Sequence, residues 1–179
     1  MDLTIYKGMD ANQRLKYIEF LLWHYRVVDS FWFISVEETH GRRSAEEMNE
    51  RVWERTGPMA ARDLVKRFEI REKGLEGLEK ALKLFPFTNI GEHQIDRTEE
   101  AIILEVPHCP AQEARTKRGL GEYDCKEMHR RAFANFAREV DPAIFVTCDF
   151  APPDPHPKNL FCKWRFSLSS EGDGAEGGD

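Results

Sequence analysis

The sequence predicts an α+β domain in which helices pack on a four-stranded antiparallel sheet, in the order α-α-α-β-β-α-β-β. Two patterns predict it: apolar residues recur every three to four positions in the first half, and every second position near the C-terminus. The length of 179 residues is ordinary for one domain. We therefore expect residues 1–169 to form a single domain and residues 170–179, which are glycine-rich and acidic, to form a disordered tail.

Cap residues and breakers delimit the helices expected in the first half. Asp10 can cap the first helix, and Ser44 with Glu47 has the spacing of a capping box at the start of the second. Gly57-Pro58 predicts a kink or a break in the second helix, and Pro86 stops the third. The three expected helices cover residues 12–41, 44–68 and 75–84.

The second half of the chain predicts the sheet and one further long helix. Asp124 can cap that helix, and Asp141-Pro142 ends it. A proline-rich loop, residues 151–159, separates the last two strands. The expected strands cover residues 91–97, 101–106, 143–150 and 160–168, and residues 110–118 form a short helix or a loop.

Charge and hydropathy restrict the partners. The net charge is −6, and the last nine residues hold four acids and no base, so the body of the chain is close to neutral. Nucleic acid is therefore not an expected partner. No apolar run approaches the ~20 residues that span a bilayer, and no secretory signal is visible, so we expect a cytoplasmic protein away from membranes. A small-molecule partner is expected, and a homo-oligomer is left open.

The four cysteines are the main functional clue, because all of them lie in the second half. Strand alternation puts Cys148 and Cys162 on the core face of their strands. A hairpin centred near Pro155 would place these two residues opposite each other, about 5 Å apart at Cβ. Cys125 and His129 stand four residues apart on the apolar face of a helix. Cys109 follows the end of a strand.

Three interpretations of these groups stay open. Cys109, Cys125, Cys148 and Cys162, with His129, form a ligand set for zinc or an iron–sulfur cluster. The same cysteines can instead be inert thiols of the core. In the third interpretation Cys125 is a catalytic thiol near a helix N-terminus and His129 accepts its proton.

A second candidate site lies in the aromatic stretch FWFISVEETHG. Trp32, Glu37 and His40 could line a ligand pocket there. The alternative is an amphipathic helix with a solvated acidic end. Motifs for nucleotide binding, serine hydrolysis and zinc proteolysis are absent from the sequence.

The segments VEETHG, HCPAQEARTKRGLGEYDC and FCKWRF resemble proteins related to the L-2-amino-thiazoline-4-carboxylic acid hydrolase-like family. The order of helices, sheet and late cysteines is also similar to the 4-vinyl reductase domain, whose members bind small ligands and metals. These resemblances imply a small-molecule role and favour metal ligation by the cysteines.

The function expected from the sequence is therefore small-molecule binding with a cysteine-ligated metal, and a hydrolase acting on a C=N or amide-like bond. An open zinc position would activate water, with His129 or Glu127 transferring the proton. The alternative is a non-catalytic sensor or accessory module that has a structural metal or only core thiols.

Overall fold

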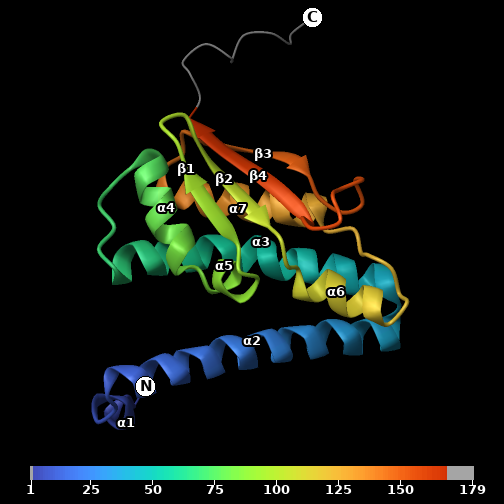
Figure 1. Cartoon of the computed structure of the whole chain (residues 1–179), viewed down its shortest axis with the longest axis horizontal. Coiled ribbons are helices and arrows are strands. Elements are labelled where there is room, and N and C mark those ends of the chain that lie inside the picture. Colours follow the sequence, from blue (N-terminus) through green and yellow to red (C-terminus); the bar gives the residue numbers. More distant parts are fainter. Residues whose placement is uncertain (1, 169–179) are drawn as a thin grey trace, which may run out of the picture.

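The structure is a computed structural model, and it describes residues 2–168 in a bundle of helices and one sheet (Figure 1). The predicted tail lies outside the described residues. The helices are α1 (Thr4–Lys7), α2 (Ala11–His40), α3 (Arg42–Arg67), α4 (Gly74–Leu84), α5 (Pro86–Ile90), α6 (Pro110–Lys117) and α7 (Lys126–Val140). The strands are β1 (Gln94–Arg97), β2 (Ala101–Val106), β3 (Ile144–Phe150) and β4 (Cys162–Leu168).

The predicted α+β class is confirmed. The four strands form one sheet in the order β1-β2-β4-β3, and every neighbouring pair is antiparallel. Strand alternation gives β4 one buried face, with Trp164 and Phe166, and one polar face, with Lys163 and Arg165. Figure 1 shows α7 and α3 beneath the sheet and α2 as the outermost layer.

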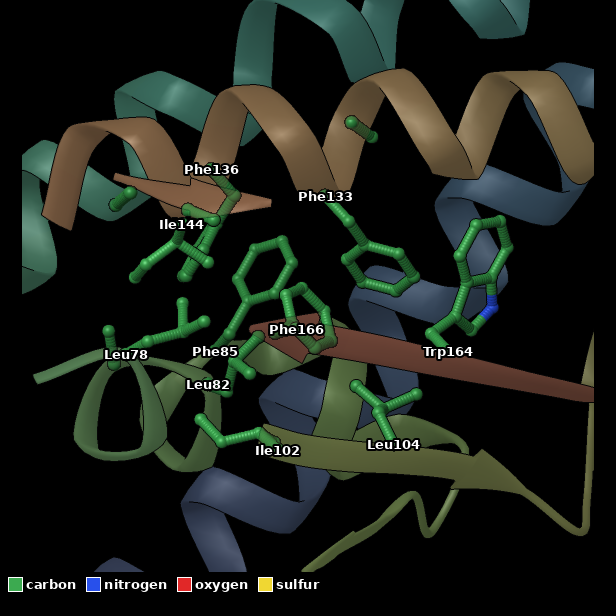
Figure 2. Packing of buried hydrophobic residues seen from close by; sticks show 14 of the residues in the cluster. Leu78, Leu82, Phe85, Ile102, Leu104, Phe133, Phe136, Ile144, Trp164 and Phe166 are labelled. Atoms are coloured by element: carbon green, nitrogen blue, oxygen red, sulfur yellow. The ribbon is translucent and has the colours of Figure 1, made fainter. Parts of the chain in front are cut away.

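The core lies between the buried face of the sheet and helices α3, α4 and α7. Phe133 and Phe136 of α7 project toward the sheet, where they meet Trp164 and Phe166 (Figure 2). The ring centroids of Phe133 and Trp164 are 5.3 Å apart at an angle of 67°, an edge-to-face arrangement. Each such side chain contributes about 1.5–3 kcal/mol by leaving water, so this cluster is the main source of stability.

Helix α2 begins at the predicted cap. The Asp10 side chain accepts from the Gln13 N–H at 2.8 Å, and the Gln13 side chain accepts from the Asp10 N–H at 2.9 Å. This reciprocal pair satisfies two donors that have no acceptor within the helix. The helix then runs for 30 residues, and none of them is buried. Most of the apolar surface of α2 therefore stays outside the core.

Helix α3 is continuous through Pro58, so the chain does not break at Gly57-Pro58. The reason lies in its packing against α7. A Cβ atom on Gly57 would lie 3.3 Å from the carbonyl oxygen of Ala132, which shows how closely the two helices approach. Contact along the buried side of α3, which includes Trp53 and Leu64, holds the helix together despite the N–H that proline removes.

Two predicted caps are also wrong. Helix α3 starts at Arg42 after Gly41, so Ser44 lies inside the helix and makes no capping bond. The residue that precedes α7 is Cys125, not Asp124, and it makes no side-chain cap bond either. Instead the Pro152 carbonyl accepts from the N–H of Cys125 and of Lys126, at 3.2 and 3.1 Å. A carbonyl group from a loop distant in the sequence therefore caps the N-terminus of α7, where the sequence predicted a local side chain.

The predicted pairing of Cys148 with Cys162 is wrong by two residues. Cys148 lies opposite Trp164, and Cys162 lies opposite Val106 of β2. A β-bulge between Cys148 and Phe150 shifts the register, and the 151–161 loop is asymmetric. Both cysteines still belong to the inward face of the sheet, but Cys162 is buried while Cys148 is only half-buried.

Candidate functional site

A cavity of about 110 Å³ lies where α2, α3, α6 and α7 meet the end of β4. An engineered apolar cavity of about 150 Å³ holds benzene. This cavity is somewhat smaller but partly open, so a single-ring molecule can bind with part of it extending through the mouth. Its walls are mostly apolar and aromatic. The lining includes polar, aromatic and thiol side chains: Tyr25, Asp29, His93, Cys109, Gln112, Cys125, His129, Cys162 and Trp164.

Two of the cavity cysteines stand at helix starts. Cys109 precedes α6, and Cys125 precedes α7. Gln112 joins these two places: its side-chain amide donates to the Tyr123 carbonyl at 2.9 Å and accepts from the Tyr123 N–H at 2.9 Å. The same Nε2 lies 3.4 Å from Cys125 Sγ. Because Gln112 is fully buried and doubly bonded, it fixes the loop that carries Cys125.

The cavity contains hydrogen-bonding groups without protein partners. The Trp164 side chain is fully buried, and its Nε1 has no hydrogen-bond partner among the described residues. His93 Nδ1 is likewise unpaired within residues 2–168. The first-turn N–H groups of Ala111 and Gln112 have no intrahelical acceptor by their position in α6, and they lie beside the sulfur of Cys109, which is a weak acceptor. The wall is therefore rich in donors and ready to meet an acceptor.

The cavity thiols are protonated at neutral pH. Burial raises the pKa of Cys162 to about 12, and it raises the pKa of Cys125 further. Burial also raises the pKa of Cys109. A nucleophilic cysteine needs a lowered pKa, because the thiolate is the reactive form. The surroundings of these thiols act in the opposite direction, which disfavours the catalytic interpretation of Cys125.

The cavity histidines are neutral. Burial lowers the pKa of His129 to about 3 and that of His93 to about 4. Aromatic rings surround His129, which stacks on Phe133 at 5.7 Å and lies 5.1 Å from Phe87. An imidazole with so low a pKa is a weak base at neutral pH. The two residues present neutral nitrogen atoms to the cavity.

Two charged residues, Arg26 and Asp29, line the cavity from α2. Partial burial of Asp29 raises the pKa of its carboxyl. Partial burial of Tyr25, together with the nearby charge of Asp29, raises the pKa of the Tyr25 hydroxyl. The wall on the α2 side therefore holds one basic and one acidic side chain.

Of the predicted metal ligands, Cys109, Cys125, Cys162 and His129 line the same cavity, whereas Cys148 does not. Burial raises the pKa of Cys148 to about 11. Within residues 2–168, no three Cys, His, Asp or Glu side chains gather closely enough to hold a metal ion. The tertiary fold thus brings three thiols to one cavity without forming a ligand cage.

The other predicted site residues lie elsewhere. Trp32 is 70% exposed, and His40 is exposed at the end of α2. Glu37 accepts two bonds from Arg115, at 2.7 and 3.1 Å, which tie α2 to α6. Glu127 is exposed and pairs with Arg130 at 2.9 Å. None of these four predicted residues lines the cavity.

Local patterns in the sequence did not indicate several of the lining residues. Trp53 and Gln112 come from helices whose side chains meet only in the folded chain. Gln112 reads in the sequence as an ordinary polar residue of a short helix, yet it is fully buried. Tyr25 and Asp29 carry the one usable signal, since they are four residues apart and therefore share a helix face.

Comparisons with known proteins complete the description. No helix among residues 2–168 combines the length and the apolar character that a bilayer span requires. Neither the curated protein sequences nor the solved structures contain a match to the chain. The resemblance to thiazoline hydrolase-like proteins therefore stays a prediction. A protein-family model matches residues 7–168, nearly the whole described chain. The chain thus belongs to the family of unknown function DUF6125.

Proposed function

We propose that this protein binds a small, largely apolar molecule that carries a carbonyl or carboxylate group, and that the cavity is the binding site. The observation that carries the proposal is the fully buried Trp164: its indole Nε1 has no hydrogen-bond partner among the described residues, and the Cys162 thiol beside it is only a weak acceptor. An unpaired buried donor costs about 1–3 kcal/mol, which a ligand acceptor would recover.

The remaining wall favours the same ligand. Most of the lining is apolar or aromatic, which suits a ring or a short hydrocarbon group. The N-terminus of α6, with the N–H groups of Ala111 and Gln112, favours an acceptor or an anion. Arg26 adds a positive charge to the same wall. A carbonyl or carboxylate bound with its apolar part inward satisfies both kinds of surface.

Binding has stronger support than hydrolysis of a C=N or amide-like bond. Hydrolysis needs a group that activates water, and the cavity candidate, His129, has a pKa of about 3. Glu127, the other predicted proton-transfer group, lies outside the cavity. A zinc or iron–sulfur centre on Cys109, Cys125 and Cys162 stays a prediction, because a metal would have to displace protons from thiols that hold them tightly.

The test compares three probes of similar size: benzoate, benzamide and toluene. Isothermal titration and protein NMR should show all three bound, with benzoate or benzamide the tightest. Trp164→Phe removes the indole N–H but keeps an aromatic ring, and it should weaken benzamide about tenfold while toluene is unchanged. The matched control is Trp32→Phe, an exposed tryptophan outside the cavity, which should leave all three affinities unchanged.

Two results would contradict the proposal. The first is no chemical-shift change for cavity residues with any of the three probes at millimolar concentration. The second is an equal effect of Trp164→Phe on benzamide and toluene, which would mean that the N–H makes no bond to the ligand. Elemental analysis of the purified protein belongs to the same experiment: zinc or iron at one equivalent, lost in Cys162→Ala, would favour the metal centre instead.

A further inference from the structure

Nine of the nineteen exposed large hydrophobic side chains among the described residues lie on α2. Five of its side chains, Ile18, Leu21, Tyr25, Val28 and Trp32, are between 44% and 70% exposed. We name these five residues the α2 seam. Figure 1 shows α2 as the outermost layer, with its N-terminal part extending away from the sheet. A helix that is apolar on all sides is ordinarily covered on all sides, but here the body of the protein covers only one.

We propose that the α2 seam is the contact surface of a homodimer, in which α2 packs antiparallel against α2 of a second copy. The seam residues follow one another at steps of three, four, three and four positions. This is the 3.5-residue repeat of a coiled-coil contact, where apolar side chains return to the same line along the helix. The spacing is nearly symmetric about Tyr25, as a twofold axis at that residue requires.

The exposed area suits a stable dimer. Leu15 and Phe31 border the seam, one on each side of the helix, and they are 60% and 62% exposed. With about 200 Å² for each large side chain, these seven residues expose roughly 750 Å², close to the ~800 Å² that each partner contributes to a standard interface. Monomeric proteins rarely leave a patch beyond ~300–600 Å² open.

Charge along α2 favours an antiparallel pair of copies. Arg14 and Lys16 lie near the N-terminus, and Glu38 is exposed near the C-terminus, where Glu37 is already paired with Arg115. An antiparallel arrangement centred on Tyr25 brings the basic end of one helix beside the acidic end of the other, whereas a parallel one would set like charges together. The two helix dipoles also oppose each other in the antiparallel arrangement, which is the favourable orientation.

A lipid surface suits α2 less well than a second copy. Helices that lie on membranes carry a basic polar face that anionic headgroups attract. Within Ala11–His40 the acids Glu19, Asp29, Glu37 and Glu38 outnumber the bases Arg14, Lys16 and Arg26. The helix therefore has no basic excess, and its apolar surface is better matched by its own copy.

The first experiment measures mass in solution by light scattering and by sedimentation at micromolar concentration. The full chain should have twice the mass of 20.9 kDa. Val28→Glu and Trp32→Glu place charges in the seam and should give monomers with unchanged circular dichroism. The matched control is Phe145→Glu, because Phe145 is 56% exposed on β3, far from α2, and this variant should stay dimeric.

The second experiment tests the orientation of the two helices. Tyr25→Cys should form a cross-linked dimer on mild oxidation, because the two copies of residue 25 meet at the axis. Arg14→Cys lies at the same phase of the helix, but in the antiparallel pair its two copies are about 33 Å apart and should not cross-link. A parallel pair would give cross-linking at residue 14 as well.

The proposal is independent of the ligand, so the probe titrations and the mass measurements can fail separately. A monomeric full chain at micromolar concentration overturns it, as does a Phe145→Glu variant that dissociates like Val28→Glu. Cross-linking at residue 14 overturns the antiparallel arrangement. A monomer that co-sediments with phosphatidylglycerol vesicles, and loses this in Trp32→Glu, identifies a membrane as the occupant and overturns the dimer.

Discussion

The neutral His129 should make the fold sensitive to acid, and His129→Phe should remove much of that sensitivity. In the unfolded chain a histidine has a pKa of about 6.5, whereas burial lowers the pKa of His129 to about 3. The unfolded state therefore binds an extra proton between these values. The stabilisation from neutral His129 is complete above about pH 6.5 and is lost as pH falls toward 3.

The magnitude follows from the same two values. A pH of 5 is about 1.5 units below the pKa of the unfolded histidine, whereas the folded histidine is still neutral at this pH. The free energy of unfolding therefore falls by about 2 kcal/mol. His93, whose pKa burial lowers to about 4, adds a loss of similar size. Phenylalanine fits among the rings of Phe87 and Phe133 and cannot be protonated, so His129→Phe should keep its stability when the pH falls.

Urea unfolding at pH 7 and pH 5, followed by circular dichroism, measures the effect. The wild-type free energy of unfolding should fall by about 2 kcal/mol more than that of His129→Phe between these values. Carboxylates titrate equally in both proteins and cancel in the comparison. Phe133→Leu is the control, because it changes packing in the same cluster without removing a titrating group. It should lower the free energy of unfolding by the same amount at pH 7 and at pH 5. Parallel pH profiles for wild type and His129→Phe would refute the reasoning.

Two further predictions concern stability. Arg115→Ala should lower the free energy of unfolding by about 3 kcal/mol, because it leaves the Glu37 carboxylate without its paired charge. Arg115→Lys cannot form two parallel bonds and should recover only part of this free energy. A loss below about 1 kcal/mol for Arg115→Ala in urea unfolding would contradict the pairing. Gly77→Ala should lower the free energy of unfolding by about 2 kcal/mol, because the new Cβ would lie 2.1 Å from the Glu72 carbonyl oxygen. In Gly8→Ala the new Cβ would meet nothing closer than 3.7 Å, so this control should leave the melting temperature unchanged.

The neutral state of the cavity connects these stability effects with the proposed ligand. Protonated thiols at Cys125 and Cys162 and an uncharged His129 make this part of the wall neutral, whereas Arg26 and Asp29 line the cavity from α2. The neutral part of the wall costs little to desolvate, and a ligand acceptor can bind the Trp164 N–H without competition from water. The same burial that makes the fold acid-sensitive thus makes the cavity suitable for a mostly apolar molecule.

The sequence by itself determined the elements whose signals are local. The helix from Asp10 to Gly41 has a reciprocal cap and a breaker at its ends, and the alternation of Cys162, Trp164 and Phe166 defines the buried face of β4. Periodicity and caps act between residues a few positions apart, so they can be read from the chain alone. For this reason the α+β class and the order of the long helices and the strands were predicted correctly, whereas the short helices α1 and α5 were not predicted.

The tertiary structure alone decided where the chemistry lies. A β-bulge set Cys148 opposite Trp164, and the Pro152 carbonyl took the place of the expected Asp124 cap. Gln112 became a buried bridge only because α6 and α7 start beside each other. These outcomes depend on contacts between segments far apart in the chain, whose energies no local pattern encodes. The cavity is the product of such contacts, and so its lining had to come from the fold.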